Sequence, residues 1–302
     1  LNGFKRQRQT DASLIRIYFR YICVQNRSMY TEYQPSHLLV PYIDNYWEFK
    51  GNPDYGMRIH ILPDGCTDFI FTLGEVANAV EEGSLIMQPY RSYFVGPMTK
   101  YSELVTYTES IHMFGVRFLP CGLSCFTNLP LHEFVNSRVS TNEMKAVFDD
   151  TFIEKLGEQK HVTDRIRVVE EYLLAYLARH YQPADSHVAM AVNMINHSGG
   201  KRSVRSLMDD VCLCQRHFER KFKHYTGLTP KEYSRIVKFK NAVELLRTTT
   251  SANLLTTAVD AGYYDLAHFS KEIKSLSGNT PASFLSLTVP EETTLTYIEP
   301  QR

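Results

Sequence analysis

This 302-residue chain has no long apolar run. No stretch approaches the about 20 consecutive apolar residues that a helix needs to cross a bilayer. We therefore expect no membrane-spanning helix and a soluble, cytoplasmic protein. With 43% hydrophobic residues, the chain is nevertheless long enough to build two cores.

Cysteine is present, but it lacks the spacing of a metal site. Cys121-x3-Cys125 and Cys212-x-Cys214 each come without the second pair that a four-ligand zinc site requires. A reactive thiol would also need an adjacent base to generate thiolate, and the sequence supplies none beside these cysteines. We therefore expect reduced, partly buried thiols rather than a thiol sensor or a methyl-accepting DNA-repair site.

Net charge is also lacking, since 33 Lys and Arg balance 33 Asp and Glu. This balance hides a strong asymmetry along the chain. Residues 201–288 hold 14 Lys and Arg against 8 Asp and Glu, whereas residues 29–160 hold 9 against 17. A basic end joined to an acidic body is typical of a protein in which only one domain meets nucleic-acid phosphate.

The basic end contains an internal repeat. A shift of 51 positions lays His217, Phe218, Arg220, Lys223, Gly227, Thr229 and Pro230 over His268, Phe269, Lys271, Lys274, Gly278, Thr280 and Pro281. Upstream, the best shift falls to 50, so that Cys212 overlays Gly262, which indicates a turn at this point. Each unit therefore predicts a short helix, a tight turn, a second helix and a Gly-x-Thr-Pro stop.

The second helix of each unit has one apolar face. Phe218 and Phe222 lie four positions apart in the first unit, as do Phe269 and Ile273 in the second. In the first unit, the other positions of this second helix are mostly polar. Its exposed side is therefore rich in cations and hydrogen-bond donors. Asp265 stands where an N-cap residue belongs, at the start of the second unit's helix.

A long helix is predicted between the two units, from Pro230 to about Thr248. It would span roughly 27 Å at 1.5 Å per residue. That length suits two helices that enter successive major grooves, about 34 Å apart. A two-repeat solenoid or a plain helical bundle would share the same helix pattern, but the basic charge of the repeat argues against both.

These residues resemble a known family. The motifs Arg216-His217-Phe218-x-Arg220-x-Phe222-Lys223 and Ala261-Gly262-Tyr263-x-Asp265-x-Ala267-His268-Phe269-Ser270-Lys271 are each followed by Gly-x-Thr-Pro. Together they resemble the double helix-turn-helix domain of the AraC/XylS family of bacterial transcription regulators, over roughly residues 187–288. The resemblance implies an all-α C-terminal domain that binds double-stranded promoter DNA.

The resemblance also implies which residues contact DNA. They are Gln215, Arg216, Glu219, Arg220 and Lys223 in the first recognition helix, and Leu266, Ala267, Ser270, Lys271 and Lys274 in the second. Arg216 and Arg220 can each bind a guanine through two hydrogen bonds, and Glu219 can accept one from cytosine. The alternatives are that Arg220 contacts only phosphate and that Glu219 only neutralises an arginine.

The second recognition helix departs from the family pattern. Leu266 and Ala267 carry no side-chain hydrogen-bonding group, so they can touch thymine methyls or read DNA shape but not a donor and acceptor code. We therefore expect the first helix to carry most of the sequence specificity. The second would mainly add affinity through Ser270, Lys271 and Lys274.

Residues 35–118 alternate in the manner of β-strands. β-rich runs flank Pro63-Asp64-Gly65, in which proline, aspartate and glycine each favour a turn, and a further pair of runs is joined by Glu109-Ser110. With Leu38 to Trp47 and Gly115-Val116-Arg117-Phe118-x-Pro120, this turn resembles a cupin-like β module often found ahead of such a DNA-binding domain. The ligands of that module are mostly unassigned.

The β region lacks the ligands of a cupin metal centre, which needs two histidines two residues apart and a carboxylate. His60 has no such neighbour and His112 stands alone, so we expect neither a metal site nor a cofactor. His60, Asp64, Asp68 and Arg117 are instead candidates to line an effector pocket, with Arg117 pairing an acidic effector. The alternatives are that Asp64 is only a turn residue and that Arg117 is only an ion-pair partner of Asp68 or Glu103.

Residues 162–180 predict an amphipathic helix. Val162, Ile166, Val169, Leu173, Tyr176 and His180 are spaced 4, 3, 4, 3 and 4 apart, as in the seam of a short coiled coil. This seam can pack on the chain's own β domain, or it can form a homodimer that places two DNA-binding domains on adjacent sites. Pro183 to Ser186 then indicate a linker.

The chain thus divides into five segments of an α+β protein. Residues 1–28, with six Lys and Arg against one Asp, are predicted to be an extension outside the functional domain. A cupin-like, β-rich sensor domain (29–160) and a helical linker (161–186) precede the AraC-type DNA-binding domain (187–288). That domain is all-α, with two helix-turn-helix units joined by a long helix. Residues 289–302 form a tail.

The expected function is sequence-specific regulation of bacterial transcription, controlled by a small molecule or by oligomerisation through the N-terminal domain. The expected partners are promoter DNA, RNA polymerase, an unidentified effector and a second copy of the chain, with the protein associated with the nucleoid. No catalytic residue is expected. The rival hypotheses are an N-terminal enzyme tethered to DNA and a ligand-independent regulator whose N-terminal domain only oligomerises.

Overall fold

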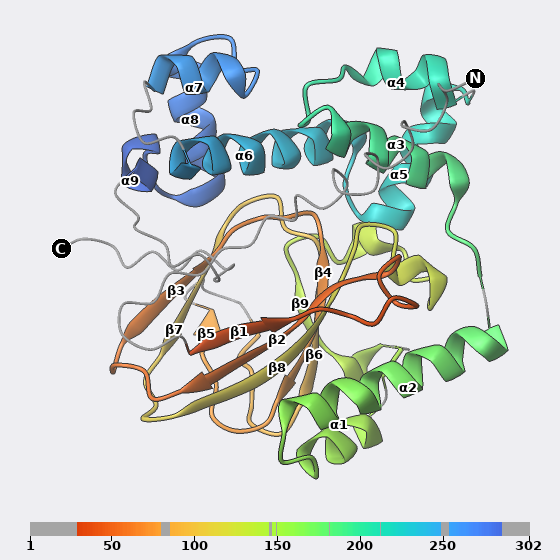
Figure 1. Ribbon diagram of the computed structural model, residues 1–302, viewed down its shortest axis with the longest axis vertical. Helices are drawn as coiled ribbons and strands as arrows, with labels where there is room; N and C mark the ends of the chain where they lie inside the picture. Colours follow the sequence, from red (N-terminus) through yellow and green to blue (C-terminus); the bar gives the residue numbers. More distant parts are fainter. Residues whose placement is uncertain are drawn as a thin grey trace, which may run out of the picture.

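The computed structural model describes residues 29–79, 85–144, 147–148, 150–180, 182–211, 213–248 and 254–285. The predicted N-terminal extension and C-terminal tail lie outside these residues. Within them, antiparallel sheets come first and a helical region follows, which confirms the expected α+β order (Figure 1). The described helices include none with the length and apolar character of a membrane span.

Two sheets form the N-terminal domain. The larger has the order β1-β2-β8-β4-β6-β9, with strands Tyr30–Tyr33 (β1), Ile43–Gly51 (β2), Ile111–Phe118 (β8), Thr67–Thr72 (β4), Ser92–Val95 (β6) and Arg138–Ser140 (β9). The smaller has the order β3-β7-β5, with strands Met57–Ile61 (β3), Ser102–Thr106 (β7) and Asn78–Ala79 (β5). The cupin-like form of this domain stays an expectation.

Both turns that the sequence predicted join strands of different sheets. The turn Pro63-Asp64-Gly65 lies between β3 and β4, and Glu109-Ser110 lies between β7 and β8. Because β3 pairs with β7 while β4 pairs with β8, each turn crosses from one sheet to the other. The turn sequences therefore locate the strand ends, but they do not determine the strand partners.

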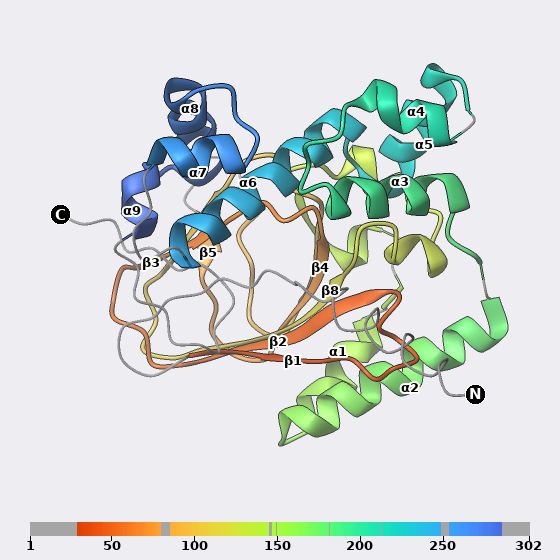
Figure 2. The same cartoon turned by 45° about the horizontal axis from the view of Figure 1, so that its top comes forward.

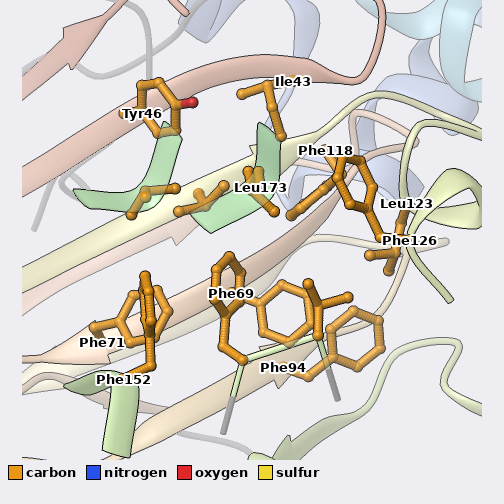
Figure 3. Packing of buried hydrophobic residues seen from close by; sticks show 14 of the residues in the cluster. Ile43, Tyr46, Phe69, Phe71, Phe94, Phe118, Leu123, Phe126, Phe152 and Leu173 are labelled. Carbon is orange, nitrogen blue, oxygen red and sulfur yellow. The ribbon is translucent and has the colours of Figure 1, made fainter. Parts of the chain in front are cut away.

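Both faces of the larger sheet are buried, as the alternation along β4 shows. Phe69 and Phe71 point to a core that is closed by helices α1 (Asp150–Gly157) and α2 (Val162–His180), whereas Ile70 belongs to a second core beneath the smaller sheet. Figure 3 shows the first core, in which aromatic side chains from the sheet face Phe152 of α1 and Leu173 of α2. Alternate side chains of one strand thus enter two different cores.

Helix α2 uses its apolar seam within the chain. Val169 and Leu173 are completely buried in the first core, and Val162, Ile166 and Tyr176 pack against the same core. Of the two expectations for this helix, packing on its own β domain is therefore the one that the structure shows. This seam is not free to bind a second copy.

The helical region is organised around one long helix. Its helices are α3 (Ser186–His197), α4 (Val204–Val211), α5 (Gln215–Thr226), α6 (Pro230–Thr248), α7 (Leu254–Asp260), α8 (Leu266–Ser277) and α9 (Pro281–Leu285). The first half of α6 contributes Ile236 to the core of α3, α4 and α5, and its second half contributes Val243 to the core of α7, α8 and α9. Figures 1 and 2 both show α6 running between these two groups of helices.

Candidate nucleic-acid interface

The first recognition helix, α5, is oriented by two phenylalanines. Phe218 and Phe222 are fully buried, and their rings pack edge to face with centroids 5.6 Å apart. This packing leaves Gln215, Arg216, Arg220 and Lys223 exposed and Glu219 half-buried. The residues that the sequence assigned to DNA in this helix therefore share its solvent-facing side.

Glu219 has a neighbour that the sequence did not indicate. The Gln215 side-chain amide donates a hydrogen bond to Glu219 Oε1, at 2.8 Å, one turn along the helix. Among the residues that the structure describes, Glu219 forms no ion pair with an arginine. The role of Glu219 toward DNA stays a prediction.

The second recognition helix, α8, begins as predicted. Asp265 is its N-cap, and its carboxylate accepts a 2.7 Å hydrogen bond from the amide of His268. Phe269 and Ile273 are fully buried, as the repeat requires. On the outer side Leu266, Ala267, Lys271 and Lys274 are exposed, and Ser270 is half-buried.

One exposed residue beside this face was missed at the sequence level. Tyr264, next to the Asp265 N-cap, leaves 90% of its surface exposed, whereas its neighbour Tyr263 is buried against Phe269. Tyr264 therefore presents an exposed aromatic ring at the start of α8. The adjacent tyrosines could have drawn attention to it, but only the fold shows which of the two is buried.

Ion pairs fix the recognition helices to the rest of the domain. Lys221 Nζ lies 2.6 Å from Asp185 Oδ2, which joins α5 to the N-cap of α3. Arg235 on α6 pairs with Glu272 on α8, with Nε 2.5 Å from Oε2. Lys221 and Arg235 thus form ion pairs within the domain. Neither is among the arginines and lysines that the sequence assigned to DNA.

The candidate effector residues separate into two places. Arg117 Nε lies 3.1 Å from Asp68 Oδ1 and 3.5 Å from Asp64 Oδ2, and the Trp47 indole donates to Asp68 at 2.8 Å. His60 lies elsewhere, on β3. The structure thus brings together three of the four candidates. It shows the ion pair of Arg117 with Asp68, whereas Glu103, the other expected partner, pairs with Arg58.

His60 lies on the outer side of β3. Its ring stacks on Tyr101 at a centroid distance of 5.7 Å, and Glu103 Oε2 is 3.5 Å from its Nε2. Neither ring nitrogen has a hydrogen-bond partner among the described residues. Burial lowers the pKa of His60, although the Glu103 carboxylate opposes this effect.

The turn that carries Asp64 also touches the DNA-binding domain. Lys240 Nζ of α6 lies 3.4 Å from the Asp64 carbonyl oxygen, and a Cβ on Gly65 would come within 2.6 Å of the Tyr233 ring. Gly65 has a φ of +83°, so both its conformation and this close approach favour glycine. The Arg117 cluster therefore lies next to the contact between the two domains.

Comparison with protein families identifies the class of protein. Residues 207–286 match a family described as a helix-turn-helix domain, and residues 31–140 match a domain of unknown function (DUF6597). The match covers α5 and α8, so the face described above belongs to a helix-turn-helix DNA-binding protein. With two such units joined by α6, the C-terminal domain is of the AraC type, and the protein is a DNA-binding transcription regulator of that type.

Solved structures show weaker likenesses. ToxT from Vibrio cholerae aligns with 80% of this chain and 97% of its own, at 9% identity and a TM-score of 0.47. ToxT bound to an unsaturated fatty acid aligns with 82% and 98%, at 13% identity and a TM-score of 0.46. The C-terminal domain of AraT, a response regulator from Geobacillus stearothermophilus, aligns with 37% and 94%, at 19% identity and a TM-score of 0.34. No curated protein matches the chain closely enough to count as a relative.

Proposed function

We propose that this regulator places α5 and α8 in neighbouring major grooves of promoter DNA and takes most of its sequence specificity from α5. The observation that carries the proposal is the exposed side of α5, where Arg216 and Arg220 stand free of the ion pairs that hold the domain together. The matching side of α8 presents Leu266 and Ala267, which can contact thymine methyls. The two helices therefore differ in which base pairs they can distinguish.

Replacing either arginine tests this proposal. Arg216→Ala and Arg220→Ala should each weaken binding to the preferred site by about 1–3 kcal/mol and relax the base preference at one position. Binding-site selection followed by titration of the selected fragment measures both effects. Arg179→Ala, at the exposed end of α2, is the matched control and should bind like the wild type. Equal information content under α5 and α8 in the selected sites would contradict the division of labour.

A small-molecule effector is a further part of the proposal, and the Arg117 cluster restricts its chemistry. Asp64 and Asp68 already balance the charge of Arg117, so an acidic effector would be repelled by two carboxylates beside it. We therefore favour a neutral or basic effector over the acidic one expected from the sequence. Thermal-shift screening with neutral, basic and acidic metabolites, on the wild type and on Asp64→Asn, tests this preference.

RNA polymerase and a second copy of the chain are also proposed partners, and we place the protein in the cytoplasm with the nucleoid. Because Val169 and Leu173 are buried within the chain, a homodimer would have to form through a surface other than the α2 seam. Size-exclusion chromatography coupled to light scattering, with and without operator DNA, measures whether a dimer forms.

A further inference from the structure

The two equivalent glycines of the repeat lie against the same loop of the β domain. A Cβ on Gly227, the C-cap of α5, would come 2.4 Å from Pro97 Cγ and 3.0 Å from the Leu131 carbonyl oxygen. A Cβ on Gly278, the C-cap of α8, would come 2.7 Å from Tyr101 Cζ. Pro97 and Tyr101 belong to the connection between β6 and β7. One short loop therefore touches the ends of both recognition helices.

Hydrogen bonds brace this loop against the segment that follows the 3-10 turn η2 (Leu131–Glu133). The backbone amide of Asn136 donates to the Pro97 carbonyl at 3.0 Å. The Asn136 side chain accepts a 2.8 Å hydrogen bond from the Thr99 backbone amide and donates one of 2.8 Å to the Thr99 hydroxyl. The Gly96 amide donates to the Ser137 carbonyl at 3.0 Å. We call residues 96–101 and 131–137 together the docking platform. Its first segment follows β6 and its second precedes β9, and these two strands pair in the larger sheet.

Further contacts seat each helix end on the platform. At α5, the His224 ring lies 6.3 Å from the ring of His132, and Val135 packs against the core of the first unit. At α8, the ring of Tyr101 stacks on the ring of His60. The platform thus has a separate contact for each unit.

The platform leaves the DNA-facing residues uncovered. Arg216 and Arg220 on α5, and Lys271 and Lys274 on α8, are exposed although the C-terminal ends of both helices are seated. Pro97 and Tyr101 are four residues apart, so their Cα atoms are at most about 14 Å apart. Movement of this single loop would therefore act on both helix ends together.

We propose that the docking platform is a clamp that holds both recognition helices in the relative orientation needed to bind two half-sites at once. The proposal rests on the proposed function, and it adds the route by which the β domain controls it. A clamp of this kind raises affinity for a two-site operator because the second helix is already oriented when the first has bound. It has no effect on binding to a single half-site.

Removing Tyr101 tests the clamp on DNA. Tyr101→Ala should weaken binding to a two-site fragment by about tenfold and leave binding to a fragment with only the α5 half-site within about twofold of wild type. Tyr107→Ala is the matched control, since Tyr107 follows the other end of β7 and is 58% exposed. Equal losses on both fragments, or tighter binding to the two-site fragment, would overturn the clamp. Failure of the wild-type protein to bind either fragment would instead reject the proposed function.

A second measurement needs no DNA. Asn136 has a φ of +56°, so Asn136→Gly relieves the backbone while it removes the side-chain bonds to Thr99. We expect hydrogen exchange at the amides of both Gly227 and Gly278 to become at least about tenfold faster. The amide of Gly262, which also has a positive φ but contacts no part of the platform, should be unchanged. Unchanged exchange at both C-caps would refute the clamp whatever the result on DNA.

Discussion

Charge balance around Arg117 decides what this residue can do. The guanidinium is buried with Asp64 and Asp68 in reach of its Nε, and Lys240 approaches the same corner from α6. Because two carboxylates lie beside Nε, the positive charge of Arg117 is already balanced, and an acidic ligand would gain little from it. The ion-pair role of Arg117 was foreseen from the sequence as an alternative, but nothing in the sequence ranks it above effector binding.

Asp44, in β2, interacts electrostatically with Arg117 and Lys240 and gives this corner a dependence on pH. Burial raises its pKa to about 6, against the opposing attraction of Arg117 and Lys240 and with added repulsion from Asp64 and Glu32. The folded state therefore holds the proton more tightly than the unfolded chain does. The contribution of Asp44 to the unfolding free energy therefore falls as pH rises from about 4 to about 6, and it is constant above that range.

Replacing Asp44 should remove this loss. Between pH 4 and pH 7, Asp44→Asn should gain on the order of 1–3 kcal/mol in unfolding free energy relative to wild type. Urea unfolding at the two pH values measures the difference. Asp54→Asn, at an exposed position, should follow the wild-type curve. Parallel curves for wild type and Asp44→Asn would show that the side chain is not protonated in the folded state.

At the scale of elements, the two recognition helices differ at their first residue. Cys214 and Asp265 are equivalent positions of the repeat, and both are N-caps. The Asp265 carboxylate accepts from the amide of His268, whereas Cys214 makes no side-chain cap hydrogen bond. At the start of α5 the equivalent amide, that of His217, donates to the Cys214 carbonyl at 3.0 Å, and a capping side chain would offer it a better acceptor.

A cap exchange tests this difference. Cys214→Ser should stabilise the protein by about 0.5–1 kcal/mol, and Asp265→Ala should destabilise it by about 1 kcal/mol. Thermal unfolding of the two variants beside the wild type measures both effects. If Cys214→Ser is neutral while Asp265→Ala is destabilising, water already satisfies the first turn of α5.

Helix α2 shows how an element's pattern can be correct while its partner is undetermined. The spacing from Val162 to Tyr176 predicted the helix and its apolar side. A heptad-like seam is the same whether the surface opposite is a second copy or a sheet of the same chain. Only the tertiary structure shows that Leu173 enters the core beside Phe69 and Phe71.

For the whole molecule, charge asymmetry predicts how binding responds to salt. Removing one cation that binds a DNA phosphate should reduce the slope of log K against log salt by about 0.9. We therefore expect Lys223→Ala and Lys274→Ala each to reduce the slope by about one, equally on specific and random DNA. Lys155→Ala, on the exposed surface of α1, should leave it unchanged. Titrations between 50 and 200 mM salt, roughly the range in which affinity for DNA falls steeply with salt, provide the measurement.

The sequence by itself determined the two repeated units, their stops at Gly227 and Gly278, the Asp265 cap and the basic character of the DNA-facing side. These features depend on residues a few positions apart, so local periodicity and capping preferences suffice to define them. Only the tertiary structure decided which strands pair, what covers α2, and that both glycines lie on one loop of the β domain. Those outcomes depend on contacts between segments far apart in the chain, and no local pattern in a single sequence encodes them.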